Sequence, residues 1–322
     1  ARLGMNGKTD MGKQDFPHRD PRQPAKGLLE RASDMFDFRS ALKGNNLPPL
    51  EVPAEMIPPP PVVTPSSLVS APAKSRAADW STRAVPVGRE GLAEHGFLVP
   101  GAPISGLAEE FRIIKRELLA EIRGAAENDD GKVVLVASAH PGEGKTFCAV
   151  NLALSLATES GLEVLLVDAD VAKREVAELL GLKAEAGLLD VLANPALRVE
   201  DHVIRTDLSG LAVLPAGTGN IQDAEYLSSG RMKDVMKALV SARPERIVIM
   251  DSAPLLAASA ASILAANVDL TLLIVRADRT TETALRDAAE LLKACPQVQL
   301  LLNGVKFSAS GRRFGSYYGR EG

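Results

Sequence analysis

Residues 136–147, VASAHPGEGKTF, have the composition and spacing of a loop that binds phosphate groups. An apolar run precedes this glycine-rich loop and a helical pattern follows it, so the loop would lie at a helix N-terminus. There the backbone N–H groups of residues 142–145 can converge on phosphate oxygens, assisted by the positive end of the helix dipole. We predict that a nucleoside triphosphate is bound by Pro141, Gly142, Glu143, Gly144, Lys145, Thr146 and Phe147.

Two side chains of this loop have specific roles in such a site. Lys145 would reach the β- and γ-phosphates, and the Thr146 hydroxyl would be a ligand of Mg²⁺. The alternative is an ordinary glycine-rich turn between a strand and a helix. GEGKT directly after an apolar strand is more specific than a loose glycine pattern, although Ala139 replaces the usual first glycine.

Two further apolar runs end in aspartate, LLVDAD at 165–170 and IVIMD at 247–251. The carboxyl ends of parallel strands are where open α/β sheets bind ligands, so these carboxylates should face the same crevice as Lys145. We predict that Asp168 and Asp251 join Thr146 as metal ligands, and that Asp168 orients or deprotonates an incoming hydroxyl. Asp170 would be a further contact to the metal or the nucleotide. The alternative is that each aspartate only caps the next helix.

Six apolar runs alternate with helical patterns from residue 132 onward, which predicts a three-layer α/β sandwich with a mostly parallel sheet. The predicted strands are 133–138, 164–168, 211–215, 246–251, 270–275 and 298–303. A further helix should begin after Ser105 as N-cap, with one apolar face. That face consists of Leu107, Phe111, Ile114, Leu118 and Ile122.

The chain divides by composition into three parts. Fifteen of the 21 prolines precede residue 105, so we predict that residues 1–104 are a largely disordered, Pro-rich arm. An amphipathic pattern predicts a short helix near 27–43, which could dock on a partner, on a membrane surface or on the chain's own domain. Residues 105–309 would form the nucleotide-binding domain, and residues 310–322 a flexible tail.

Composition disfavours several classes of function. A net charge of −4 and 4% aromatic residues do not suggest a nucleic-acid-binding surface. Two separated cysteines and four histidines give neither a disulfide framework nor a zinc site, which fits a reducing cytoplasm. The apolar stretch 255–275 contains Asn267 and Asp269, so we expect no transmembrane helix.

The ordered set SAHPGEGKT, LLVDAD and VIMDSAP resembles the Walker A, A′ and B motifs of the bacterial tyrosine autokinases, which are cytoplasmic kinases of capsule and exopolysaccharide export. The segment LAEEFRIIKREL is similar to the family's EFR helix, and LLIVRADRTT at 272–281 is also similar to the family. The match spans about residues 105–308. The Pro-rich arm looks most like the exosortase-associated branch of the family.

The resemblance implies a P-loop NTPase fold with deviant Walker motifs, and an ATP- and Mg²⁺-dependent kinase that phosphorylates its own tail. The acceptors would be Tyr317 and Tyr318. Asn303 would contact the adenine, although it could also be a turn residue before Gly304.

The resemblance also implies partners and a location. Subunits would form a homo-oligomer through the helix at 105–123. A membrane polysaccharide co-polymerase of the chain-length-determinant type would activate the kinase, and a phosphotyrosine phosphatase would reverse its action. The protein would then be cytoplasmic and peripheral at the inner membrane.

Two other interpretations stay open at this point. Partitioning and cell-division-positioning ATPases share the fold, but they have a signature lysine where this chain has His140. A nucleotide-gated scaffold of the export complex is favoured by a tail with only two tyrosines. It is also favoured by Ala172, where the family often has arginine, although Lys173 and Arg174 follow.

Overall fold

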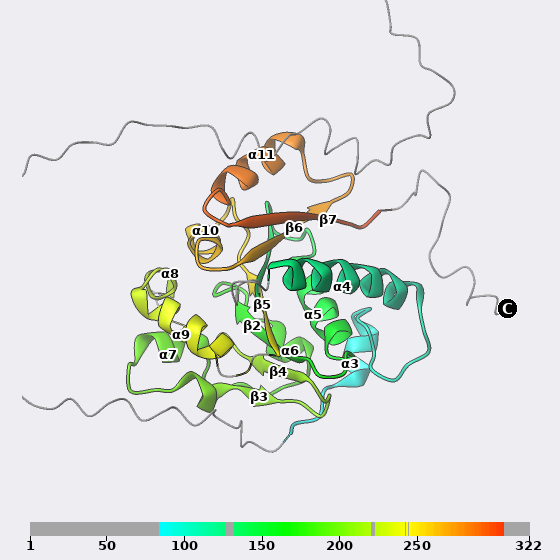
Figure 1. Cartoon of the computed structure of the whole chain (residues 1–322), viewed down its shortest axis with the longest axis horizontal. Coiled ribbons are helices and arrows are strands. Elements are labelled where there is room, and N and C mark those ends of the chain that lie inside the picture. Colours follow the sequence, from blue (N-terminus) through cyan, green and yellow to red (C-terminus); the bar gives the residue numbers. More distant parts are fainter. Residues whose placement is uncertain (1–83, 126–131, 220–222, 242, 244, 306–322) are drawn as a thin grey trace, which may run out of the picture. The chain divides into compact units, whose positions relative to one another are not determined.

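One mixed sheet organises the part of the chain that the computed structural model describes, residues 84–125, 132–219, 223–241, 243 and 245–305. Within these residues the strand order is β3-β4-β2-β5-β1-β6-β7 (Figure 1). The strands are β1 (Val133–Ser138), β2 (Glu163–Ala169), β3 (Ile204–Arg205), β4 (Leu211–Leu214), β5 (Arg246–Ser252), β6 (Leu270–Arg276) and β7 (Gln297–Asn303).

The strand pairs are parallel, apart from the antiparallel pair of β3 and β4. Every residue of β1 and β5 is buried because helices cover both faces of the sheet. The predicted three-layer fold and its six strands are therefore confirmed. The two-residue strand β3 was not predicted, since so short a segment has no readable periodicity.

The helices lie in two layers, one on each side of the sheet (Figure 1). A cluster of buried apolar residues fills the space between each helical layer and the sheet. On one side are α3 (Arg89–Glu94), α4 (Gly106–Ala125), α5 (Lys145–Leu156) and α6 (Val176–Leu179). On the other are α7 (Leu188–Ala193), α8 (Asp223–Leu227), α9 (Gly230–Ser241), α10 (Ser259–Ala265), α11 (Glu282–Leu291) and the 3₁₀ helix η3 (Val199–His202).

Helix α4 has the cap and the apolar face that the sequence predicts. The Ser105 hydroxyl oxygen accepts a hydrogen bond from the Ala108 N–H at 3.2 Å. Phe111, Leu118 and Ile122 are buried against α5 and the sheet. Lys115 is also buried, and its ammonium group pairs with Glu159 at 2.6 Å.

The segment before α4, residues 84–104, is ordered, although it lies within residues 1–104, which the sequence predicts to be largely disordered. Val87, Leu92 and Phe97 are buried in the same apolar cluster as α4 and α5. The Val85 N–H also donates to the Arg205 carbonyl at 2.8 Å, which attaches this segment next to β3. The prolines of residues 84–104 suggested a linker, but the apolar residues between them supply enough buried surface to order the segment.

Other predictions fall outside the described residues. The helix near 27–43 and the tail at 310–322 lie there, so their structure is not addressed. Among the described residues, no helix is both long and apolar enough to cross a membrane.

The two cysteines, Cys148 and Cys295, are free and buried. Burial raises the pKa of the Cys148 thiol to about 12.

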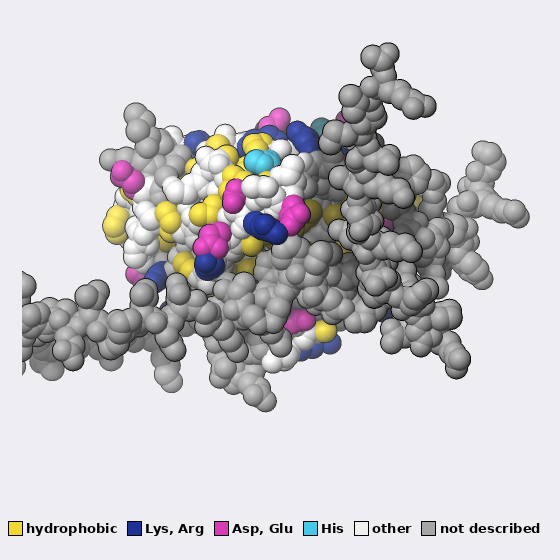
Figure 2. Space-filling view, turned by 90° about the horizontal axis from the view of Figure 1, so that it is seen from above, with side chains coloured by type: hydrophobic (Ala, Val, Ile, Leu, Met, Phe, Trp, Pro, Cys, Tyr) yellow, Lys and Arg dark blue, Asp and Glu magenta, His cyan; other side chains and the backbone are white. Residues whose placement is uncertain are grey.

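The surface seen from above carries charged residues of both signs, with apolar residues between them (Figure 2). On α11, for example, Arg286 pairs with Glu282 at 2.6 Å. Exposed pairs of this kind contribute little to stability.

The order of residues 84–104 can be tested by truncating apolar side chains. Leu92 is fully buried, so Leu92→Ala should lower the free energy of unfolding by about 2–5 kcal/mol. Ile104 is 55% exposed, and Ile104→Ala should cost less than about 1 kcal/mol. Urea unfolding followed by circular dichroism measures both changes. Equal, small effects would mean that this segment does not belong to the folded domain.

Candidate nucleotide-binding site

The phosphate-binding loop, residues 139–144, connects the end of β1 to the start of α5. Two of its glycines adopt positive φ, 75° at Gly142 and 99° at Gly144. A Cβ atom at Gly144 would lie 2.1 Å from the Asn303 side-chain nitrogen, so only glycine fits there. Since the loop ends at the N-terminus of α5, its backbone N–H groups are placed to bind an anion.

Three aspartates lie at the ends of two neighbouring strands. Asp168 of β2 is in register with Asp251 of β5, and Asp170 follows directly after β2. All three are at most 3% exposed. The Lys145 ammonium group, at the start of α5, contacts Asp170 at 2.6 Å. The structure therefore brings Lys145, Asp168, Asp170 and Asp251 together as predicted, at the carboxyl edge of the sheet.

The three carboxylates are held in different ways. Asp170 pairs with Lys145, and its other oxygen accepts the Ala172 and Lys173 N–H groups at 3.3 Å. Asp168 accepts two backbone N–H groups at 3.2 Å, one from Asp170 and one from Val176. Within the described part of the chain, neither oxygen of Asp251 has a partner with hydrogen-bond geometry, although the Lys145 ammonium group and the Thr146 hydroxyl lie near enough to lower its pKa.

Burial dominates the electrostatics of this cluster. It raises the pKa of Asp251 to about 7, against the opposing effects of the Lys145 charge and the Thr146 hydroxyl. It likewise raises the pKa of Asp168 to about 6, although two backbone hydrogen bonds favour the ionised form. Burial lowers the pKa of Lys145, but the charges of Asp251 and Asp170 raise it more, so the net shift is upward.

The residues present fit a bound Mg²⁺–nucleotide complex. A buried carboxylate without partners requires an explanation, and a bound cation is one such explanation. Three carboxylates beside a single lysine also carry more negative than positive charge. A divalent ion would balance that excess, with Asp251 and Thr146 as the side chains to hold it and Asp168 next to them.

Several predicted contacts to the nucleotide have other partners here. The Phe147 ring packs on Phe97 and Phe111, with centroids 5.3 and 6.3 Å apart, so its side chain belongs to the apolar layer. The Glu143 carboxylate is 1% exposed and accepts the His140 N–H at 2.9 Å. For Phe147 and Glu143, only the backbone N–H is then left for a phosphate. Pro141 is exposed at the loop surface and has no N–H to donate.

Asn303 lies at the end of β7, next to the loop. Its side-chain amide donates to the Glu143 carbonyl at 2.9 Å, so it supports the backbone of the loop. Contact with an adenine stays a prediction. Tyr317 and Tyr318 lie outside the described residues.

Sequence reasoning missed Thr280, whose hydroxyl donates to the Glu143 carboxylate at 2.5 Å. Thr280 belongs to the passage LLIVRADRTT, but nothing in that passage reveals a contact with a loop 137 residues away.

Lys173 and Arg174, considered as substitutes for a missing arginine, both interact with residues close to them in the sequence. Lys173 pairs with Glu175 at 2.6 Å, and Arg174 donates to the Val171 carbonyl at 2.7 Å.

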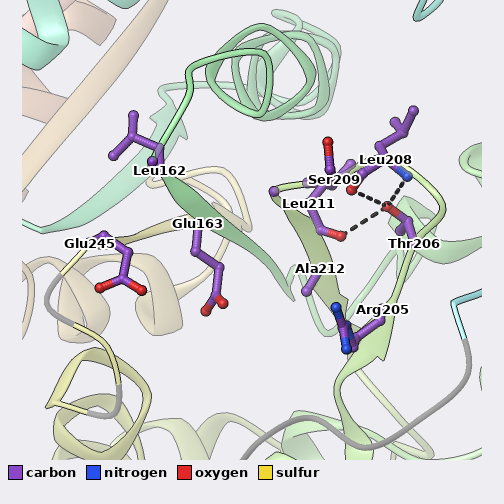
Figure 3. A pocket seen from close by; sticks show the side chains of 11 residues that line it. Leu162, Glu163, Arg205, Thr206, Leu208, Ser209, Leu211, Ala212 and Glu245 are labelled. Carbon is purple, nitrogen blue, oxygen red and sulfur yellow. Dashed lines mark hydrogen bonds between the residues drawn. The ribbon is translucent and has the colours of Figure 1, made fainter.

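A separate pocket of about 260 Å³ lies at the opposite edge of the sheet, where β2 and β4 begin (Figure 3). The Thr206 hydroxyl there donates to the Leu211 carbonyl at 2.9 Å and accepts the Leu208 N–H at 3.2 Å. Glu163 pairs with the buried Arg246 at 2.5 Å. These polar groups are satisfied within the protein, in contrast to Asp251, so the carboxyl edge is the better candidate site.

Fold and site together define a P-loop NTPase with deviant Walker motifs, and the comparisons agree. Residues 131–305 match a family described as an AAA domain. The tyrosine-protein kinase YwqD of Bacillus subtilis is 34% identical over 219 residues, which is 67% of this chain and 88% of YwqD. The kinase domain of VpsO, a solved structure, has a TM-score of 0.52 and 29% identity, and the match covers 61% of this chain and 96% of that domain.

The chain therefore belongs to the bacterial tyrosine-kinase family. A relative with a polysaccharide role in its name is the succinoglycan biosynthesis transport protein ExoP of Rhizobium meliloti, 29% identical over 243 residues, or 69% of this chain. The chain spans only 29% of the length of ExoP, and 27% of the EpsB proteins of two Ralstonia species.

The raised pKa values predict how stability without ligand depends on pH. The folded state retains protons on Asp251 and Asp168 that an unfolded aspartate, with a pKa near 3.8, has already released. The free energy of unfolding should therefore fall as the pH rises from about 5 to about 8. Asp251→Asn should reduce this fall by roughly 1–3 kcal/mol, as measured by urea unfolding at both pH values.

Asp287→Asn is the matched control, because Asp287 is exposed on α11. It should leave the pH dependence as it is in the parent protein. If Asp251→Asn behaved like this control, the Asp251 carboxyl group would not be the buried, proton-binding group described here.

Proposed function

We propose that this protein is an ATP- and Mg²⁺-dependent protein-tyrosine kinase that phosphorylates its own C-terminal tail and thereby regulates exopolysaccharide polymerisation or export. The observation that carries the proposal is the buried, unpartnered Asp251 carboxylate, in register with Asp168 and beside Lys145 at the end of a phosphate-binding loop. Family membership supports the tyrosine as acceptor, and the name of ExoP supports the link to polysaccharides.

In the proposed reaction, backbone N–H groups of residues 142–146 hold the phosphates of ATP. Lys145 exchanges its contact with Asp170 for the β- and γ-phosphates, where its charge offsets the negative charge that develops during transfer. Asp251 and Thr146 would hold Mg²⁺, which when bound supplies charge stabilisation to the transferred phosphoryl group.

Asp168 is suited to act on the incoming tyrosine. Two backbone N–H groups fix the orientation of its carboxylate, and a pKa of about 6 leaves it mostly ionised at neutral pH. It can therefore accept the proton of the tyrosine hydroxyl as the oxygen forms its bond to the γ-phosphorus and the bond to ADP breaks. Tyr317 and Tyr318 are the proposed acceptors. Phosphorylation would add about 1.5–2 negative charges to each, beside the arginines of the tail.

Assembly is part of the proposal. In α4, Arg112 pairs with Glu109, and the Arg112 side chain is 67% exposed whereas the Glu109 side chain is 13% exposed, so Arg112 is the member of the pair that can contact another subunit. Lys115, the third residue of the family-like pattern, is bound to Glu159 within the same chain. We therefore propose a homo-oligomer formed through the helix at 105–123, with Arg112 as an exposed contact residue and the tail of one subunit entering the site of its neighbour.

The remaining proposals concern the cellular setting. A membrane polysaccharide co-polymerase would recruit and activate the kinase at the cytoplasmic side of the inner membrane, and a phosphotyrosine phosphatase would reset the tail. The prolines before residue 105 support placing the protein in the exosortase-associated branch.

The test is mass spectrometry of the purified protein incubated with ATP and Mg²⁺, with the cytoplasmic segment of a candidate co-polymerase added. Phosphate should appear on Tyr317 or Tyr318. Lys145→Ala should reduce it by at least about 100-fold, because it removes the charge that faces the transferred group. Lys293→Ala, at an exposed lysine of the same domain, should have no effect.

Bound ATP without phosphotyrosine would contradict the kinase and favour a nucleotide-gated scaffold. Steady release of inorganic phosphate without phosphotyrosine would favour an ATPase of the partitioning type.

A further inference from the structure

Glu143 places a buried carboxylate inside a loop built to bind anions. It is 1% exposed, so water cannot solvate its charge. One oxygen accepts the His140 N–H at 2.9 Å, which closes the loop on itself. The other accepts the Thr280 hydroxyl at 2.5 Å, which joins the loop to a distant part of the chain. A negative charge beside phosphates is unfavourable, so this carboxylate needs a role other than direct contact with the nucleotide.

Thr280 lies in the turn between β6 and α11, and its hydroxyl has little freedom. The oxygen accepts the Arg276 N–H at 2.9 Å, and the Thr280 N–H donates to the Arg276 carbonyl at 3.0 Å. With that acceptor position filled, the hydroxyl proton is directed at Glu143. A hydrogen bond from a hydroxyl to a carboxylate is stronger than one between neutral groups. The turn therefore holds the loop through a single charge-assisted bond.

Asn303, at the end of β7, provides a second connection to residue 143 of the loop. Its side-chain amide donates to the Glu143 carbonyl at 2.9 Å, and its backbone carbonyl accepts the Ala277 N–H at 2.8 Å. Residue 143 is thus held by its side chain from the turn and by its backbone from the end of β7. Gly144 comes next, and a side chain at this position would collide with the Asn303 amide.

We propose that Thr280 is a positioning residue for ATP binding, which acts through the Glu143 carboxylate to hold the phosphate-binding loop in its binding conformation. The inference rests on the proposed nucleotide site and deepens it. A loop that is already ordered does not have to be ordered by the ligand, so its N–H groups bind phosphate with less loss of conformational freedom.

The experiment measures ATP affinity directly, by calorimetry on the full chain, for three variants. Thr280→Val keeps the shape of the side chain and removes the hydroxyl, and should raise the Kd for ATP roughly tenfold, as expected for loss of a charge-assisted hydrogen bond. Thr280→Ser restores the hydroxyl and should bind within about twofold of the parent. Thr283→Val makes the same change at an exposed position of α11 and should have no effect.

Hydrogen exchange without nucleotide is the second readout. Thr280→Val should speed exchange of the amides of residues 139–146 and leave β2 and β5 unchanged, whereas general destabilisation would speed exchange in all of them. In a double-mutant cycle, Thr280→Val should have a smaller effect in a Glu143→Gln background, because the charged partner is already gone.

The proposal is overturned if Thr280→Val and Thr283→Val bind ATP equally and exchange equally in the loop. The measurements need no phosphoryl transfer, so they separate this inference from the proposed function. A parent protein that binds ATP but never forms phosphotyrosine would contradict the kinase and leave the role of Thr280 standing.

Discussion

The burial of Asp168, Asp170 and Asp251 around a single lysine is the constraint on which the rest of this structure depends. Carboxylates in an apolar interior are costly unless they are paired or bound to a cation. Only Asp170 has a full ion pair, with Lys145, and Asp168 depends on backbone N–H groups. Among the described residues, Asp251 has neither an ion pair nor a hydrogen bond from a backbone N–H group. A bound cation would therefore stabilise the folded chain at this site.

The fold keeps this cluster in place by being rigid on both sides. The strands that carry Asp168 and Asp251 are neighbours in parallel register, and apolar helical layers cover both faces of the sheet. Closely packed interiors of this kind resist rearrangement, so the carboxylates cannot move apart to reduce their repulsion. The phosphate-binding loop is not enclosed by apolar layers in this way. Hydrogen bonds from Thr280 and Asn303 to Glu143 hold it in place instead.

The parts that could be predicted from sequence are those that depend on local pattern. Continuous apolar runs identified the buried strands, and the aspartates that end two of them had to meet because parallel strands end at one edge. The residues GEGKT identified the phosphate-binding loop, and Ser105 identified the start of α4. These features follow from short stretches of residues, so no knowledge of distant contacts was needed.

The parts that could not be predicted depend on contacts between distant segments. Residues 84–104 have the prolines of a linker, but Leu92 and Phe97 find an apolar surface that the sequence does not display. The sequence places Phe147 beside the phosphate-binding loop, yet its ring packs on Phe97 and Phe111. The Glu143–Thr280 bond joins positions 137 residues apart. Partner choice of this kind is set by tertiary packing, which local pattern does not encode.

We predict that the Asp251 carboxyl group, whose pKa burial raises to about 7, ionises when a Mg²⁺–ATP complex binds. Calorimetry with preformed Mg²⁺–ATP near pH 7, in buffers of different ionisation enthalpy, counts the protons released. We predict a net release on the order of half a proton per site in the parent protein, and a markedly smaller release in Asp251→Asn. Binding with no proton release, or with the same release in both proteins, would contradict the account.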